Sequence, residues 1–270
     1  RRVYEGLSTG CIVLSTHSIG ITKKFNKLVK IANTKKETEE YIMNLLGDTK
    51  EYNKLSHKCY STIINTENYK NRLKKIIDIA GIEYYEESDD IVNIIIIVNK
   101  NNDINDILDF YNKNIKNQSY NCIIVTIFCS NKKKINVLKK NIEELNVKII
   151  HYKTKQDVIN KINNFKNLYM TVFDINDIYD NNFIKDTLLA TLYIDKDTKM
   201  IGKRCYIDKK NIIHNSKYEH RYVEQLKRNS IIFTKNANQE VIDSIYNLDK
   251  FYSAECKKYS VELYNYISNI

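Results

Sequence analysis

The chain has 270 residues, with 43 Lys and Arg against 33 Asp and Glu, so its formal net charge is +10. It contains no Pro, no Trp and six Gly, which excludes collagen-like, Pro-rich and Gly-rich linker architectures. Hydrophobic residues make up 43% of the chain, enough for a sizeable core, so a wholly disordered chain is also excluded. The excess of Lys, Asn, Ile and Tyr is typical of an AT-rich coding sequence, which weakens any inference from charge to nucleic-acid binding.

The first 82 residues are predicted to form an α/β segment that ends in helices. A helix end at 2–7 precedes two short apolar runs, at 11–15 and 28–32, which predict buried strands. Apolar residues at helical spacing then predict helices at 36–46, 50–64 and 69–80, and Asp48 is placed to cap the second of these. Because residue 1 is Arg rather than Met, we expect the chain to be a piece of a longer protein.

The acidic, turn-prone segment 83–90 predicts a linker to a second domain at 91–270. In this domain buried-type strands alternate with helices: strands at 91–98, 122–128, 147–152 and 168–173, helices at 103–115, 133–145 and 156–165. Such alternation predicts an open parallel sheet covered by helices, with ligands bound beyond the carboxyl ends of its strands. After residue 174 the pattern changes to a helix at 181–193, β-rich segments at 199–207 and 229–234, a helix and a last strand, which would complete the site.

Cysteine usage and hydropathy indicate a cytoplasmic protein. The six Cys are scattered without a CxxC pair, which is typical of free thiols in a reducing compartment and argues against a zinc site. No signal peptide is visible. The longest apolar stretch, 91–98, is far shorter than the roughly 20 residues of a membrane span, although the chain could still associate peripherally with a membrane.

The candidate site residues follow the strand at 168–173. Asp174, Asn176 and Asp177 lie at its predicted carboxyl end. Carboxylate and amide oxygens can hold a hard divalent cation, and the cation can bridge a diphosphate and stabilise it as it leaves. The alternative is an ordinary strand-to-helix turn, since Asp and Asn favour turns and caps.

Four motifs follow one another in the stretch 169–203: Phe173-Asp174-Ile-Asn176-Asp177-Ile-Tyr179, Asn181-Asn-Phe183-Ile, Leu192-Tyr193-Ile-Asp195 and Met200-Ile-Gly202-Lys203. With these motifs the stretch resembles the central block of family-2 glycosyltransferases of the GT-A fold. Three flanking segments extend it to about 90–270: Asn117-Gln118-Ser-Tyr120 to Val125, Arg221-Tyr-Val223 to Lys235, and Asn247-Leu-Asp249-Lys-Phe251. The order of these motifs is more specific than any one of them. The resemblance implies a Rossmann-like open sheet that binds a nucleotide-diphospho-sugar.

The resemblance also implies roles for individual residues. Asp174 would face the ribose or diphosphate of the donor and, with Asn176, would hold Mg²⁺ or Mn²⁺. Asp177 would support the cluster or bind the donor sugar, and Lys203 would lie near phosphate. Asp249 would be the general base that takes the proton of the acceptor hydroxyl as it attacks the anomeric carbon with inversion. The alternatives are a helix-capping role for Asp249 and a solvated Lys203.

Two departures from the family pattern leave a second function open. Asn176 stands where the family usually has a metal-binding Asp, and a neutral ligand would weaken metal binding. The strand at 122–128 runs into Phe128-Cys-Ser130-Asn131, without the carboxylates that usually grip the nucleotide. The alternative is therefore a catalytically degenerate GT-A-fold protein that acts as a glycan- or partner-binding module.

The first 82 residues resemble another group, the GT-B glycosyltransferases of the spore-maturation type. The segments that carry this resemblance are Arg2-Val-Tyr-Glu5 to Ser15 and Asn65-Thr-Glu-Asn-Tyr69 to Arg72. They imply the incomplete C-terminal end of a GT-B domain, in which Glu5 would hydrogen-bond the donor ribose. The alternative for Glu5 is an ordinary helix carboxylate.

Together these features predict a bacterial glycosyltransferase of cell-surface polysaccharide synthesis. Its partners would be a nucleotide-sugar donor and a glycan, lipid-linked or protein acceptor. Nucleic acid is not expected as a partner. The 21 Tyr and the net charge would suit base stacking in a basic groove, but the dense Lys run is limited to 132–134, and such a short run is usually a solvated face.

Overall fold

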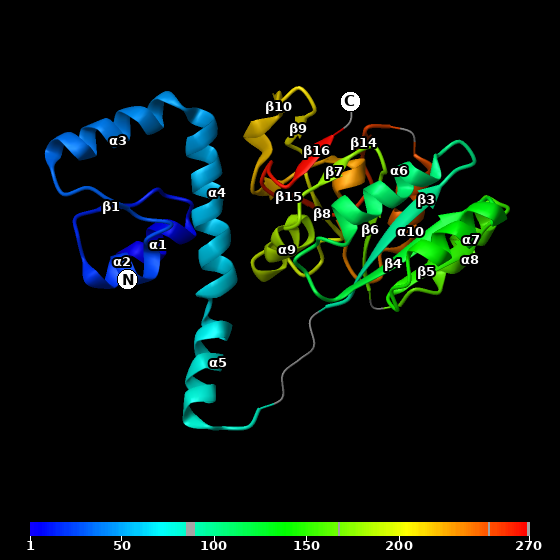
Figure 1. Cartoon of the computed structure of the whole chain (residues 1–270), viewed down its shortest axis with the longest axis horizontal. Helices are drawn as coiled ribbons and strands as arrows, with labels where there is room; N and C mark the ends of the chain where they lie inside the picture. Colours follow the sequence, from blue (N-terminus) through cyan, green and yellow to red (C-terminus); the bar gives the residue numbers. More distant parts are fainter. Residues whose placement is uncertain (85–89, 167, 248, 269–270) are drawn as a thin grey trace. The chain divides into compact units, whose positions relative to one another are not determined.

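The computed structural model describes residues 1–84, 90–166, 168–247 and 249–268 (Figure 1). The chain divides into two compact units, Arg1–Glu87 and Ser88–Ile270. The linker predicted at 83–90 falls mainly on residues 85–89, outside the described residues. None of the helices in the described ranges is both long and apolar enough to cross a membrane.

The first unit is a small α/β segment with its own core. Its elements are α1 (Arg2–Ser8), β1 (Leu14–Ser15), α2 (Ile19–Phe25), β2 (Lys30–Ile31), α3 (Lys35–Gly47), α4 (Thr49–Thr66) and α5 (Tyr69–Ala80). The strands β1 and β2 pair in parallel, and α4 packs on α1 through the buried Cys59 and Ile63. Asp48 caps α4 as predicted, because its side chain accepts from the Glu51 N–H at 3.0 Å. The helix α2 was not predicted from the sequence.

The second unit is built on a mixed sheet of eight strands, in the order β11-β15-β8-β13-β6-β3-β4-β5. The strands of the whole unit are β3 (Val92–Val98), β4 (Ile123–Cys129), β5 (Val147–His151), β6 (Tyr169–Phe173), β7 (Ile178–Tyr179), β8 (Met200–Gly202), β9 (Tyr206–Asp208), β10 (Ile213–His214), β11 (Arg221–Tyr222), β12 (Leu226–Lys227), β13 (Ile232–Phe233), β14 (Phe251–Tyr252), β15 (Lys258–Ser260) and β16 (Tyr266–Ser268). The helices are α6 (Ile104–Phe110), α7 (Lys132–Asn141), α8 (Lys155–Asn163), α9 (Phe183–Leu188) and α10 (Asn238–Tyr246).

The predicted parallel half of this sheet is confirmed: β6, β3, β4 and β5 pair in parallel. Apart from the buried Asn93, the strand β3 consists of Val and Ile and is buried on both faces, as expected of a central parallel strand. Its alternate residues pack on two helical layers, since Ile94 and Ile96 share a core with α6 and α7, whereas Ile95 shares one with α8 and α10. The helices therefore cover both faces of the sheet.

The helices differ from their predicted bounds in two informative places. The helix predicted at 103–115 is α6 followed by a five-residue π-helix, Tyr111–Ile115. Its buried Asn114 accepts from the backbone N–H of Tyr179 at 2.8 Å, a tertiary contact that the helical pattern does not reveal. The helix predicted at 181–193 is α9 followed by a 3₁₀ turn, Leu189–Leu192.

The C-terminal half completes the unit with antiparallel and mixed pairing. The strand β13 inserts between β6 and β8 and is antiparallel to both. Gly202, at the end of β8, lies so close to the 3₁₀ turn Arg228–Ser230 that a Cβ there would come within 2.7 Å of the Ser230 carbonyl oxygen. Two smaller sheets, β10-β9-β16-β7 and β12-β14, flank the main one. Because β13 pairs with β6, the turn Arg228–Ser230, which precedes β13, lies against β6.

Candidate active site

A cavity of about 580 Å³ opens at the carboxyl end of the parallel strands. Its lining comes from the loops that follow three of these strands: Asn99 and Asn102 after β3, Tyr152 and Lys153 after β5, Asp174 and Asn176 after β6. Arg228 and Asn229 close it from the C-terminal half. The volume lies within the roughly 300–1,000 Å³ of small-molecule sites.

The sheet register explains why these loops meet. The ends of β3 and β4 are aligned, with Val98 opposite Cys129, and Phe173 at the end of β6 lies opposite Ile96. Parallel strands place all their carboxyl ends at one edge, where polar residues can converge without entering the core. Tyr152 and Asn99 contact each other across this edge, at 3.2 Å between hydroxyl and amide oxygen.

The carboxylates of Asp174 and Asp177 lie on either side of one amide group. Asn229 Nδ2 donates to Asp174 Oδ2 at 3.2 Å and to Asp177 Oδ2 at 2.9 Å. The other oxygen of Asp174, Oδ1, accepts from both the backbone N–H and the Nδ2 of Asn176, at 2.9 Å each. Asp174 is half-buried and reaches the cavity, whereas Asp177 is buried.

Two buried tyrosines hold this centre in place. The Tyr179 hydroxyl accepts from the Asp174 backbone N–H at 3.0 Å and donates to the Asn229 carbonyl at 2.9 Å, while its ring stacks on Phe173 at 3.7 Å. The Tyr266 hydroxyl donates to Asp177 Oδ2 at 2.7 Å. Burial, followed by the charge of Asp177, raises the pKa of Tyr179 well above 10. Burial also raises the pKa of Tyr266 well above 10, with Tyr179 and then Asp177 as further causes. Both hydroxyls therefore keep their protons and remain donors.

Arg228 supplies a positive charge at the cavity wall. Its Nε donates to Asn229 Oδ1 at 3.2 Å, and its Nη1 donates to the carbonyl of Asn247. The first contact fixes the orientation of the Asn229 amide, because the oxygen faces the guanidinium and the NH₂ group faces the carboxylates. A guanidinium in this position can bind a phosphate group in a bidentate manner.

The divalent metal predicted at Asp174 and Asn176 does not fit the residues as they are arranged. A hard cation needs oxygen lone pairs directed at one point. Here the two facing carboxylate oxygens accept from Asn229, Tyr266 adds a donor to Asp177, and Asp174 Oδ1 accepts from Asn176. N–H and O–H donors therefore occupy the place that the ion would take. Across the described ranges no group of three or more His, Cys, Asp and Glu is arranged to hold a metal ion.

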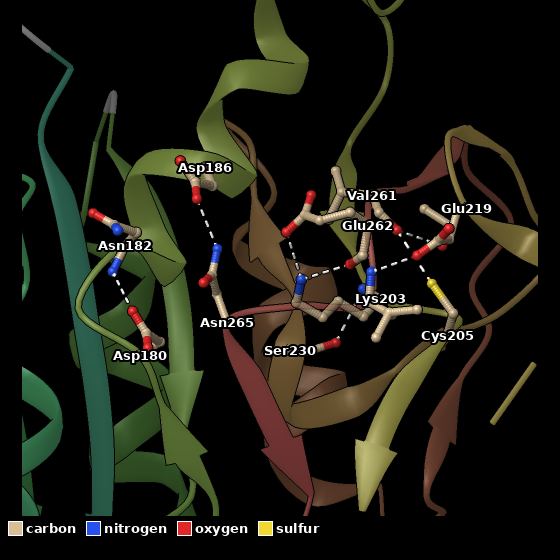
Figure 2. A network of polar contacts seen from close by, with 12 residues as sticks. Asp180, Asn182, Asp186, Lys203, Cys205, Glu219, Ser230, Val261, Glu262 and Asn265 are labelled. Atoms are coloured by element: carbon tan, nitrogen blue, oxygen red, sulfur yellow. Dashed lines mark hydrogen bonds and ion pairs between the residues drawn. The ribbon is translucent and has the colours of Figure 1, made fainter. Parts of the chain in front are cut away.

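Lys203 does not line the cavity and belongs to the buried polar network of Figure 2. Its side chain is fully buried, and its Nζ donates to the Glu262 carboxylate at 2.9 Å and to the Glu262 carbonyl at 2.6 Å. Its backbone N–H donates to Ser230 Oγ at 3.0 Å. The structure therefore surrounds Lys203 with protein groups rather than leaving it solvated or open to a phosphate.

The two remaining predicted residues, Asp249 and Glu5, are exposed. Asp249 lies between α10 and β14, and its backbone N–H donates to Asn247 Oδ1 at 2.7 Å. Asn247 is the residue whose carbonyl accepts from Arg228. Glu5 belongs to the first unit, where its carboxylate pairs with Arg1 Nε at 2.6 Å.

Three residues of the site were not predicted from the sequence: Arg228, Asn229 and Tyr266. The first two directly precede the apolar segment Ser230-Ile-Ile-Phe233, so a polar pair in front of a buried strand is their local signal. Nothing in the local sequence marks Tyr266, which reaches Asp177 only through the pairing of β16 with β7.

No protein-family model matches the chain, and no curated protein matches it. Similar solved structures include S. aureus TarS 1–349, at 12% identity and a TM-score of 0.42 over 66% of this chain, and the same protein in complex with UDP-GlcNAc, at 11% identity and 0.42 over 67%. The chain covers 60% and 59% of those two chains. The mannosyltransferase PcManGT from Pyrobaculum calidifontis, in complex with GDP-Man and Mn²⁺, matches at 8% identity and 0.42, over 77% of this chain and 67% of that one. At these identities and TM-scores the likeness says nothing about function.

Proposed function

We propose that the second unit is a glycosyltransferase of the GT-A fold, similar to family 2, that uses a nucleotide-diphosphate-sugar. The observation that carries this proposal is the convergence of Asp174, Asn229 and Arg228 on the cavity at the carboxyl end of the parallel strands. Carboxylates there suit the hydroxyls of a ribose or a sugar, and a guanidinium suits a diphosphate. The sequence motifs between residues 169 and 251 support the same assignment.

Asp174 would accept from hydroxyl groups of the donor, since it is the cluster carboxylate that lines the cavity. Asp177, which is buried and held by Tyr266, would support it rather than touch the sugar. Arg228 would bind the diphosphate and stabilise the negative charge that develops on the leaving group. This role replaces the one that the sequence predicted for Lys203, whose ammonium is bound to Glu262.

Asp249 would act as general base in an inverting displacement. Asp249 is exposed, and its backbone N–H donates to Asn247, whose carbonyl accepts from the cavity-lining Arg228. These contacts support a position of Asp249 near the cavity. An exposed carboxylate on this loop could take the proton of an acceptor hydroxyl as the hydroxyl attacks the anomeric carbon. The acceptor would be a glycan, a lipid-linked sugar or a protein, in a bacterial cytoplasm and in the synthesis of cell-surface polysaccharide.

We assign the first unit to the C-terminal end of a GT-B glycosyltransferase domain of the spore-maturation type. The support is the motif from Arg2 to Ser15, together with the observed order of α1, a short parallel strand pair and C-terminal helices. Glu5, on α1, would bind the donor ribose in a complete domain of that type.

The test is turnover of nucleotide-sugars by the full chain. We expect hydrolysis or transfer with at least one sugar of a panel of UDP- and GDP-linked donors. Asp174→Ala and Asp249→Ala should each lower turnover by roughly 100-fold or more, because loss of a general base alone costs about 10²–10⁴. The matched control is Asp106→Ala, which removes an exposed carboxylate of α6 away from the cavity lining. Unchanged turnover in both site variants would contradict the assigned roles.

The second candidate is a catalytically degenerate GT-A-fold module that binds a glycan or a partner. It is favoured by the exposed Asn176 in place of a carboxylate and by the carboxylate-free end of β4 at Phe128–Ser130. Calorimetry with UDP and GDP separates the two functions. A folded protein that binds neither nucleotide would favour the binding module.

A further inference from the structure

We propose that this site holds the donor diphosphate with protein charge alone, through Arg228, and that Asn229 occupies the place of a bridging divalent cation. This inference rests on the proposed function and concerns how the same site binds its donor. Arg228 would touch the diphosphate, whereas Asn229 is a positioning residue that acts through the two carboxylates.

The Asn229 amide takes the position that a shared cation would occupy. Its single Nδ2 lies within hydrogen-bond distance of one oxygen from each carboxylate, 3.2 Å from Asp174 Oδ2 and 2.9 Å from Asp177 Oδ2. An NH₂ group has two hydrogens, so it can satisfy both oxygens at once. Two carboxylates that face each other repel, and a cation or a hydrogen-bond donor between them offsets this repulsion. The Asn229 amide is such a donor.

The contacts around Asn229 exclude the opposite orientation of its amide. Its Oδ1 accepts from Arg228 Nε at 3.2 Å, so a flipped amide would direct NH₂ at the guanidinium and an oxygen at two carboxylates. The backbone is held as well, because the Asn229 carbonyl accepts from the Tyr179 hydroxyl at 2.9 Å. Asn229 is therefore fixed at both its side chain and its main chain.

Charge balance explains how an anionic donor could bind beside two carboxylates. Asp177 is buried, accepts from Tyr266 and is not one of the residues that line the cavity. The buried Lys227, the last residue of β12, directly precedes Arg228, and the charges of Asp177 and Asp174 act on its ammonium. Arg228 reaches the cavity wall, where its fork of N–H donors matches phosphate oxygens.

The first test measures nucleoside diphosphate binding by calorimetry with the full chain, using UDP and GDP, each in EDTA and in Mn²⁺. We expect the same affinity in both conditions for the nucleotide that binds. Binding that appears only with Mn²⁺ would overturn the inference and leave the proposed function intact. Binding in neither condition by a folded chain would overturn both.

The second test removes the charge of Arg228. Arg228→Ala should weaken nucleotide binding in EDTA roughly 10- to 100-fold, the usual effect of losing a charged hydrogen bond, and Arg228→Lys should recover part of it. The matched control is Arg221→Ala, which removes an exposed arginine of β11 and should change nothing. Equal affinities in all four proteins would show that Arg228 does not bind the diphosphate and would overturn the inference.

The third test needs no nucleotide, so it examines Asn229 independently of the proposed function. Electron paramagnetic resonance measures how much Mn²⁺ remains free. We expect the wild type to leave the ion free, and Asn229→Asp to bind it by adding a third carboxylate at the centre. The control Asn105→Asp adds a carboxylate at an exposed position of α6 and should bind none.

Two results of the Mn²⁺ measurement would overturn the inference. One is Mn²⁺ binding by the wild type that Asp174→Ala abolishes. The other is a folded Asn229→Asp that binds no more Mn²⁺ than the wild type. If circular dichroism shows that Asn229→Asp is unfolded, Asn229→Ala replaces it, since it empties the place between the two carboxylates. It should bind more Mn²⁺ than the wild type, and failure to do so would count equally against the inference.

Discussion

The second unit contains two charged clusters that differ in what surrounds them. In one, the Lys203 ammonium and the Glu262 carboxylate are 2.9 Å apart, with side chains 0% and 5% exposed. In the other, Asp174 and Asp177 share the Asn229 amide at the wall of a cavity, beside Arg228. The clusters are neighbours, because Ser230, which binds the Lys203 backbone, follows Asn229 directly. The Lys203–Glu262 pair, which we call the closed pair, is buried and contributes to the stability of the fold. The Asp174–Asp177 cluster, which we call the open cluster, reaches a cavity and can therefore contact a ligand.

The largest effect is expected from breaking the closed pair. Lys203→Met leaves the Glu262 carboxylate buried without its ammonium and should lower the free energy of unfolding by about 3–5 kcal/mol. Urea unfolding, followed by circular dichroism, measures this loss. Nucleotide affinity, measured below the transition, should stay unchanged.

The double variant Lys203→Met/Glu262→Leu is the control for this prediction. Replacing both charges with apolar groups of similar volume should recover most of the stability, because no buried charge is then left behind. A single variant as stable as the wild type would contradict the comparison. A single variant with a much lower nucleotide affinity would contradict it as well.

A smaller effect is expected in the open cluster. Tyr266→Phe removes the 2.7 Å hydrogen bond to Asp177 and should lower the free energy of unfolding by about 2 kcal/mol, as for other hydrogen bonds to charged groups. Unlike Lys203→Met, it should also weaken nucleotide binding, since Asp177 and Asp174 hold the same amide. Thermal unfolding and calorimetry measure the two effects. If Tyr266→Phe lowers the free energy of unfolding but leaves the nucleotide affinity unchanged, Tyr266 acts on stability alone and the prediction is wrong.

The smallest effect is the pH dependence that Lys227 gives to stability. Burial lowers the pKa of this lysine below 10.5, although Asp177 and Asp174 partly oppose the shift. Between the lowered pKa and 10.5 the unfolded state binds more protons than the folded state, so this group makes stability rise with pH. Lys227→Met removes that contribution. The stability of the wild type relative to the variant should therefore increase as the pH approaches 10.5, and urea unfolding at several pH values measures it. A constant difference would show that Lys227 titrates alike in both states.

The parallel half of the fold could be predicted because its signals are local. The nearly continuous run of Val and Ile in β3 and the apolar spacing of the helices are each visible within a few residues, as is the Asp48 cap in the first unit. The mixed half could be predicted only as β-rich. Its strands are two or three residues long, and partners such as β13 and β6 are far apart in the sequence. Strands that short carry no clear alternation, so only their tertiary pairing defines them.

The position of Asp174 at the carboxyl end of a parallel strand could be predicted from the sequence, whereas its contacts could not. A carboxylate after a buried strand correctly indicated the edge at which Asp174 meets the cavity. The same pattern suggested a metal, because it could not show that Asn229, 55 residues later, places an amide between the carboxylates. It also suggested a phosphate contact for Lys203, because it could not show the burial of that side chain against Glu262. Both differences come from contacts between residues remote in sequence.

The π-helix at Tyr111–Ile115 has a consequence for how this unit tolerates insertions and deletions. A π-helix accommodates one residue more than an α-helix does in the same stretch, so deleting one residue there would restore regular α-helical winding and move the side chains within that turn, while the flanking turns keep their phase. The side chain at risk is Asn114, which binds the Tyr179 backbone two residues beyond Asp177. A single-codon deletion in this stretch should thus harm the distant site more than most substitutions at the surface of α6, and a deletion scan of residues 104–118 would locate that sensitivity.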